Sequence, residues 1–121
     1  MKVFVYRNLR KKCYSIKALE GAMKGKVIAH ASTVTLNECR FKVSKAGQAR
    51  VRATKQKNVH AGVQGQWDGE IDPSMPADVS VSLYYNPYKV DTFVTFLTHE
   101  PVEAAEKVYL GFTGVFADKL K

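Results

Sequence analysis

Apolar and polar residues alternate strictly along two stretches of this chain, residues 59–67 and 79–85. In the first stretch the odd-numbered positions are Val59, Ala61, Val63, Gly65 and Trp67. A period of two places successive side chains on opposite faces of a strand, whereas an amphipathic helix needs a period near 3.6. The alternation therefore predicts strands that bury one face and keep the other polar, which favours a fold built on a sheet.

Short runs rich in Val, Ile, Phe and Tyr predict further strands around these two. They cover residues 2–6, 13–19, 26–30, 33–36, 92–97, 108–112 and 115–117. The inward-facing positions change from even to odd between Leu36 and Cys39, which predicts a bulge or break near Asn37 and Glu38. We expect one helical turn over residues 101–106 and an exposed acidic loop over residues 68–78.

Residues 44–57 form the one candidate for a helix of several turns. Ser44 is a suitable N-cap, and Ala46, Ala49 and Ala53 fall on one face of the predicted helix. A stripe made only of Ala predicts shallow packing, and Gly47 lowers the helix propensity further. An extended basic arm is the alternative for this segment.

A chain of 121 residues can bury a sizeable core as one unit. We expect a single domain over residues 1–121, of the α+β class, with a mainly antiparallel sheet or small barrel and one short helix. The apolar runs are far shorter than the roughly 20 residues that span a bilayer, and no apolar signal segment follows Met1. We therefore expect a cytoplasmic protein with no membrane partner.

The two cysteines, Cys13 and Cys39, form no CxxC pair and have no His at ligand spacing. A disulfide between them is geometrically possible if their strands are neighbours. Two reduced, semi-buried thiols are the expectation for a reducing compartment.

The charges of the chain are strongly segregated. Residues 1–60 carry 15 Lys and Arg against two acids, a net of +13, and residues 61–121 carry four against nine, a net of −5. A basic half of this density predicts a positive face that meets phosphate or an acidic partner. A solvated face that only keeps the protein in solution is the alternative.

Two basic segments are the candidates for contact with nucleic acid, a predicted hairpin tip at residues 10–12 and the helical candidate. Lys and Arg neutralise phosphates and release counterions, and Arg can hold a phosphate with two hydrogen bonds. The predicted nucleic-acid-binding residues are Arg10, Lys11, Lys12, Lys45, Arg50, Arg52, Lys55, Lys57 and, at the edge of the surface, His60.

The sequence contains no recognisable catalytic or metal-binding set. His30, His60 and His99 match no ligand spacing, and no nucleophile, base and orienting residue can be assembled. Asp68 and its acidic neighbours Glu70 and Asp72 are more typical of a solvated loop than of a cation site. We therefore expect no enzyme activity, no metal and no cofactor.

Several stretches of the chain resemble an uncharacterised family of small proteins encoded by tailed bacteriophages. They are KKCYSIKALEG (Lys11–Gly21), GKVIAH (Gly25–His30), FKVSKAGQARV (Phe41–Val51), KNVHAGVQG (Lys57–Gly65), YNPYKVDTFV (Tyr85–Val94) and PVEAAEKVYL (Pro101–Leu110). The resemblance covers most of the chain and carries over no catalytic residue. It implies a phage accessory factor that modulates host machinery.

Three functions are consistent with this reading. The first is non-catalytic binding of nucleic acid or a nucleoprotein complex through the basic face. The second is inhibition of a host enzyme or defence complex by binding an acidic protein surface, which needs an apolar or aromatic centre, such as Tyr14 or an exposed aromatic residue, as well as charge. The third is a virion or assembly component in which the acidic half of one subunit meets the basic half of the next.

Overall fold

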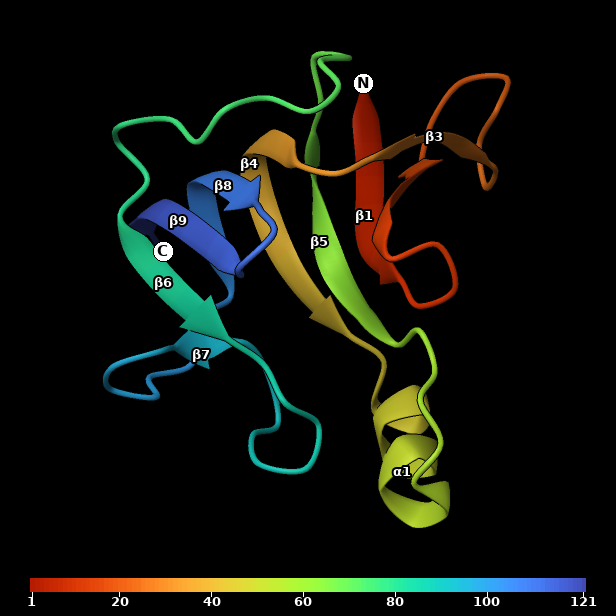
Figure 1. Cartoon of the computed structure of the whole chain (residues 1–121), viewed down its shortest axis with the longest axis vertical. Coiled ribbons are helices and arrows are strands. Elements are labelled where there is room, and N and C mark those ends of the chain that lie inside the picture. The colour runs from red at the N-terminus through yellow and green to blue at the C-terminus, as the bar shows by residue number, and fades with distance from the viewer.

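Nine strands form one antiparallel sheet in the computed structural model, which describes residues 1–121 (Figure 1). Their order across the sheet is β3-β2-β1-β5-β4-β8-β9-β6-β7. The strands are β1 (Lys2–Asn8), β2 (Cys13–Ala18), β3 (Val27–Ala31), β4 (Val34–Val43), β5 (Ala61–Gln66), β6 (Val81–Tyr84), β7 (Val94–Thr95), β8 (Ala104–Leu110) and β9 (Val115–Leu120). The edge strands β3 and β7 do not pair with each other, so the sheet is open. The predicted antiparallel α+β fold is confirmed, and its small-barrel variant is wrong.

The two halves of the sequence occupy separate halves of the sheet. Strands β1 to β5 lie together on one side, and β6 to β9 lie together on the other, joined through the β4–β8 pair. In Figure 1 the red-to-green strands and the blue strands accordingly separate to right and left. The charge division along the sequence therefore becomes a division in space, because the basic half of the chain supplies four of the five strands in the first group and the fifth, β5, carries no charged residue.

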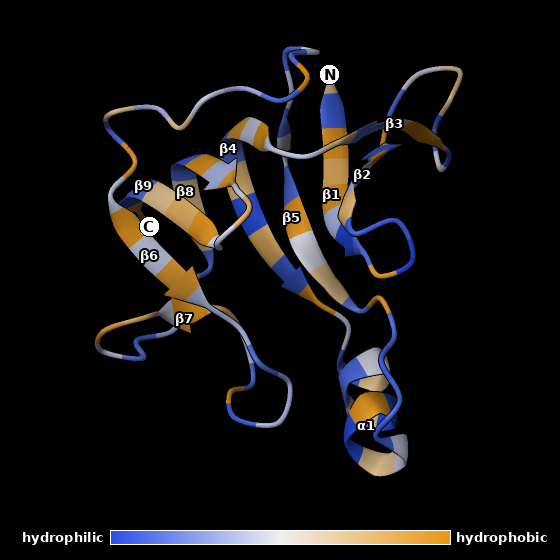
Figure 2. Cartoon of the chain, in the orientation of Figure 1, coloured by the Kyte–Doolittle hydropathy of each residue, from blue (hydrophilic) through white to orange (hydrophobic).

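The core lies where the inward-facing residues of both halves meet. The fully buried residues of this core include Val3 and Val5 of β1, Leu36 of β4, Val63 of β5 and Val108 of β8. Burying one such aliphatic side chain contributes about 1.5–3 kcal/mol. Figure 2 shows the resulting alternation of apolar and polar residues along the strands.

The bulge predicted in the middle of β4 is confirmed. The register between β4 and β5 shifts between Asn37 and Arg40, and Glu38 adopts a left-handed backbone with φ of 51°. The extra residue changes which side of the strand faces inward, so Leu36 and Cys39 are both buried despite their opposite parity.

Two predictions near the C-terminus are wrong. The helical turn expected at residues 101–106 is instead the approach to β8, whose Ala104 and Ala105 already pair with β4. The strand expected over residues 92–97 is reduced to the two residues of β7. In both places pairing with neighbouring strands decides the backbone conformation. Local propensity alone does not determine it.

The helix α1 (Lys45–Thr54) connects β4 to β5. The Ser44 side chain accepts a hydrogen bond from the Gly47 amide (3.2 Å), and the helix ends at Lys55, which is left-handed and whose amide donates to the Val51 carbonyl. The extended-arm alternative is therefore wrong for residues 45–54. Residues 55–60 are outside any helix or strand.

The buried face of α1 differs from the predicted stripe of alanines. Gly47, Gln48 and Val51 are buried, whereas Ala46 and the other two predicted alanines are exposed. A Cβ on Gly47 would lie 2.5 Å from the Cβ of His60, so only a glycine lets the helix approach the start of β5 this closely. The helix is held in place by this close approach and by polar contacts. The spacing of apolar residues in the sequence indicates neither of them.

Both cysteines are free thiols, as expected. Cys13 in β2 is partly exposed and Cys39 in β4 is buried, and two strands lie between β2 and β4. No helix in the structure is long and apolar enough to cross a membrane.

Candidate functional site

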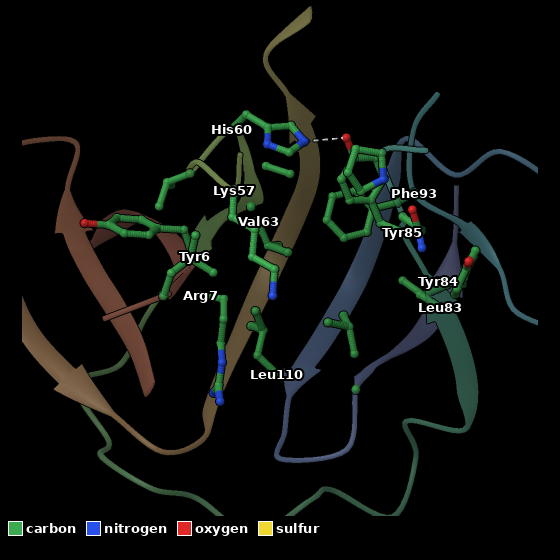
Figure 3. A pocket seen from close by; sticks show the side chains of 18 of the residues that line it. Tyr6, Arg7, Lys57, His60, Val63, Leu83, Tyr84, Tyr85, Phe93 and Leu110 are labelled. Carbon is green, nitrogen blue, oxygen red and sulfur yellow. Dashed lines mark hydrogen bonds between the residues drawn. The ribbon is translucent and has the colours of Figure 1, made fainter. Parts of the chain in front are cut away.

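A pocket of about 840 Å³ lies between the two halves of the sheet. Figure 3 shows Arg7 and Lys57 on one side, Leu83, Tyr85 and Phe93 on the other, and His60 above them. The apolar lining includes Val5, Val63, Leu83, Leu110 and Val115, which come from both halves of the sheet. The pocket therefore exists only in the assembled sheet.

The charged side chains that line this pocket are all positive. Arg7, Lys55 and Lys57 line it together with His60, and no Asp or Glu is among its lining residues. None of the three cations forms an ion pair with a carboxylate elsewhere in the chain. The pocket thus combines an apolar interior with unneutralised positive charge.

Arg7 is positioned by Tyr14 of the neighbouring strand. The two residues are register partners in the β1–β2 pair, and the Arg7 guanidinium lies 5.3 Å from the centre of the Tyr14 ring. The Tyr14 hydroxyl donates to the Gly111 carbonyl (2.8 Å), which fixes the ring. Burial raises the pKa of the Tyr14 phenol, with Arg7 partly offsetting it. Tyr14 therefore remains neutral, and its ring stabilises the Arg7 guanidinium by a cation–π interaction.

A chain of hydrogen bonds closes one end of the pocket and joins the two halves of the sheet. Nδ1 of His60 faces two oxygens of Asn58, the side-chain Oδ1 at 3.0 Å and the carbonyl at 3.2 Å, so Nδ1 carries the proton in the neutral ring. Nε2 then accepts from the Tyr85 hydroxyl (2.7 Å), which in turn accepts from Nε2 of Gln48 (3.0 Å).

Burial raises the pKa of the Tyr85 phenol, and the Gln48 hydrogen bond and Arg52 partly offset that effect. The phenol therefore remains a donor. His60, which was expected on the outward side of its strand as a possible phosphate contact, instead lies against Asn58 and Tyr85. The imidazole is partly buried, and both of its ring nitrogens already have partners within the protein.

The segment 86–91 is tied to α1 by basic side chains. Arg52 donates to the Pro87 carbonyl through Nε and pairs with the Asp91 carboxylate (2.9 Å), and Lys45 donates to the Asp91 carbonyl (2.6 Å). The Arg52 guanidinium lowers the pKa of Asp91 by hydrogen bonding and by charge. These two predicted phosphate-binding residues hold the wall of the pocket in place.

The other predicted basic residues gather at one end of the sheet. Strands β1 and β4 both run antiparallel to β5, so both end where β5 begins. The hairpin tip that follows β1 and the helix that follows β4 consequently lie at the same end (Figure 1). The exposed cations there are Arg10, Lys11, Lys12, Arg50, Lys55 and Lys57.

Asn8 shapes the tip of the hairpin. Its side-chain Oδ1 accepts from the amides of Arg10 (3.0 Å) and Lys11 (2.9 Å), and Lys12 takes a left-handed conformation with φ of 56°. The three basic side chains of the tip are exposed on a defined turn.

Sequence reasoning missed Arg7 and Tyr85, which both line the pocket. Arg7 shares the odd-numbered parity of the buried Val3 and Val5 in β1, which places it on the same face of the strand, although its own side chain is exposed. No comparable signal exists for Tyr85, because its partners His60 and Gln48 are distant in sequence. The structure contains no group of three or more His, Cys, Asp or Glu side chains placed to hold a metal ion.

The acidic loop carries no cation-binding arrangement of its own. The Asp72 carboxylate accepts from the Ser32 amide (2.6 Å), and Asp68 accepts from the Glu70 amide (2.9 Å). Asp72 thereby fastens the loop to the turn between β3 and β4, which is a structural role.

A family model described as the Mycobacterium phage L5 gene 82 protein matches residues 1–118. The chain belongs to this family. The Gene 82 protein of Mycobacterium phage L5 is 41% identical to the chain over 124 residues, covering 97% of this chain and 95% of the relative. No solved structure matches the chain. The predicted resemblance to a bacteriophage family is confirmed, and the match spans the hairpin tip, α1 and the pocket.

Proposed function

We propose that this phage-family protein is a non-catalytic accessory factor that binds nucleic acid, free or within a nucleoprotein complex. Contact is made at the end of the sheet where the β1–β2 hairpin and α1 lie. The protein acts in the cytoplasm of the infected cell.

The observation that supports this proposal is a gathering of unpaired cations around a pocket that no carboxylate lines. Arg7, Lys55 and Lys57 belong to the pocket, and Arg10, Lys11, Lys12 and Arg50 extend the positive surface to the hairpin and the helix. Phosphate binding requires such free cations, because a cation already paired with a carboxylate must lose that partner first.

Some of the predicted basic residues already have partners within the protein. Arg52 and Lys45 hold the segment 86–91 against the helix, and His60 bonds to Tyr85. Phosphate contact is therefore assigned to the remaining basic residues and to Arg7.

The test is fluorescence anisotropy with labelled mixed-sequence DNA and RNA, titrated from about 50 to about 200 mM salt. The double variant Lys55→Gln/Lys57→Gln should weaken binding and reduce the slope of log affinity against log salt by about one to two, since each lost phosphate contact removes about one released counterion.

The matched control is Lys24→Gln/Lys26→Gln, which removes the same charge from the same basic half. These two exposed lysines lie in the turn between β2 and β3, at the opposite end of the sheet. The control should change the slope much less. Equal losses from both variants would mean that net charge alone attracts nucleic acid, and absence of binding at low salt would refute the proposal.

Exposed apolar residues favour a second function, recognition of a host protein. Leu97 is 90% exposed, Phe112 is 76% exposed and Phe96 is 53% exposed. Such residues are typical of protein contacts, whereas Tyr14, the aromatic expected to serve here, is buried. Under this second function, Leu97→Ser and Phe112→Ser should abolish capture of a host protein and leave nucleic-acid binding unchanged.

A further inference from the structure

We propose that the pocket between the two halves of the sheet binds a nucleotide, with its base inside the pocket and its phosphate at Arg7, Lys55 and Lys57. The inference rests on the proposed function and specifies the ligand of the same surface.

The positive charge of the pocket favours an anionic ligand. Its lining contains three cations and no carboxylate, although the chain as a whole has 11 Asp and Glu. A concave surface with low-dielectric walls concentrates the field of its charges, so an anion gains more here than on a flat surface. Arg7 supplies a planar guanidinium that can bind two phosphate oxygens together.

The interior of the pocket suits a flat aromatic group. Tyr85 and Phe93 form a stacked pair with ring centres 5.2 Å apart, and Tyr88 at the rim has the Lys55 ammonium 5.1 Å from its ring centre. Aromatic side chains beside cations are the usual elements of sites that stack an unpaired base and neutralise its phosphate.

Polar groups at the rim distinguish a base from an aliphatic anion. Ser82, Asn86 and Thr113 line the pocket, and their side chains can bond to the edge of a base. A fatty acid would leave these groups without partners. The volume of about 840 Å³ is within the range of small-molecule sites and accommodates a nucleotide with solvent.

A nucleotide at this site could be free or part of a strand. Leu9 lines the pocket and directly precedes Arg10, Lys11 and Lys12 of the hairpin tip. The positive surface thus continues from the pocket to the tip, which provides cations for neighbouring phosphates of a strand. Single-stranded nucleic acid is therefore the favoured source.

The experiment blocks the pocket without changing any charge. Thr113 lines the pocket from the exposed turn between β8 and β9, so Thr113→Trp fills the entrance with a bulky side chain at a position that tolerates it. Phe112→Trp is the matched control, because Phe112 is exposed next to it and does not line the pocket. Arg7→Gln is the second variant and removes one cation of the lining.

The probes are AMP and UMP in calorimetry, and a labelled single strand and its duplex in anisotropy. We expect both mononucleotides to bind and the single strand to bind more tightly than the duplex. Thr113→Trp should weaken single-strand binding roughly tenfold or more, the loss typical of a stacked base, and leave duplex binding unchanged. Arg7→Gln should weaken mononucleotide binding, and Phe112→Trp should change neither.

Each contrary result has a distinct meaning. Single-strand binding that survives both Thr113→Trp and Arg7→Gln would overturn the inference while the proposed function stands. Mononucleotide binding without any binding of DNA or RNA would support a free nucleotide as the ligand and refute the proposed function. Binding of oleate at the pocket with no binding of AMP or UMP would overturn the inference in favour of a fatty anion.

Discussion

Gly47, the third residue of α1, packs directly against His60, the residue before β5. A Cβ built on Gly47 would lie 2.5 Å from the Cβ of His60. Because the helix can approach this closely, Gln48 reaches Tyr85 and Asp91, and the wall of the pocket is joined to the helix. Gly47 lowers the helix propensity of this segment, but the absence of a side chain there permits the close contact with His60 that holds α1 in place.

Gly47→Ala should destabilise the protein. In an exposed helix the same change would stabilise by about 0.5–1 kcal/mol, but here the added methyl overlaps His60 and should cost about 1–3 kcal/mol. Urea unfolding measures the difference in the free energy of unfolding. Ala53→Gly, at an exposed position of α1, is the control and should show only the loss from helix propensity. A more stable Gly47→Ala protein would contradict the close contact.

Tyr85→Phe should lower the free energy of unfolding by about 1–3 kcal/mol. The change removes only the hydroxyl that bonds to Nε2 of His60 and Nε2 of Gln48. It leaves Nε2 of the partly buried His60 without a partner and Nε2 of the buried Gln48 with the Asp91 carbonyl alone. Tyr84→Phe is the matched control, since the hydroxyl of Tyr84 has no hydrogen bond within the protein. ¹⁵N NMR of His60 should show the proton on Nδ1 in the neutral ring, and a proton on Nε2 would contradict the inferred direction of the chain.

The pairing of Asp91 with Arg52 should make stability depend on acid pH. Arg52 lowers the folded-state pKa of Asp91 below its ordinary value of 3.8. The contribution of the ionised carboxylate is therefore present above 3.8 and lost as the pH falls through the folded-state pKa.

Asp91→Asn should consequently destabilise the protein at neutral pH and lose this effect in acid, as measured by unfolding midpoints across pH. Asp118→Asn is the control, because Asp118 forms no ion pair. NMR titration of Arg52→Gln should show the Asp91 pKa moving upward, and an unchanged pKa would contradict the pair.

The two thiols should differ sharply in reactivity. Burial raises the pKa of the Cys39 thiol to about 12, whereas Cys13 is partly exposed. Because the thiolate is the reactive form, iodoacetamide at about pH 8 should label Cys13 alone in the folded protein. Intact mass spectrometry should show one added group before denaturation and two after it, and Cys13→Ser should show none in the folded state.

Cys39 should also contribute to loss of stability in alkali. Its thiol pKa is raised above the ordinary value of 9.0, so the folded state favours the neutral form. That contribution is complete below 9.0 and is lost as the pH rises toward the folded-state value of about 12. Cys39→Ala should therefore lose less stability than the unchanged protein over this interval, as unfolding midpoints at rising pH would show. Equal losses would contradict the assignment.

The sequence by itself determined the elements that follow from local chemistry. Alternation of apolar residues predicted β5 and β6, the change of parity after Leu36 predicted the bulge of β4, and Ser44 predicted the start of α1. The segregated charges and the resemblance to a phage family were also visible there. In each case the signal lies in residues that are close in the chain.

Only the tertiary structure decided which strands are neighbours and which basic residues remain free. Arg50 and Arg52 look equivalent in the sequence, but Arg52 is paired with Asp91 because β6 and β7 bring that aspartate to the helix. The pocket likewise needs Arg7 and Tyr85 to line the same hollow, which depends on a strand order set by long-range pairing. Such pairing depends on the burial of apolar faces from distant segments, which no local pattern encodes.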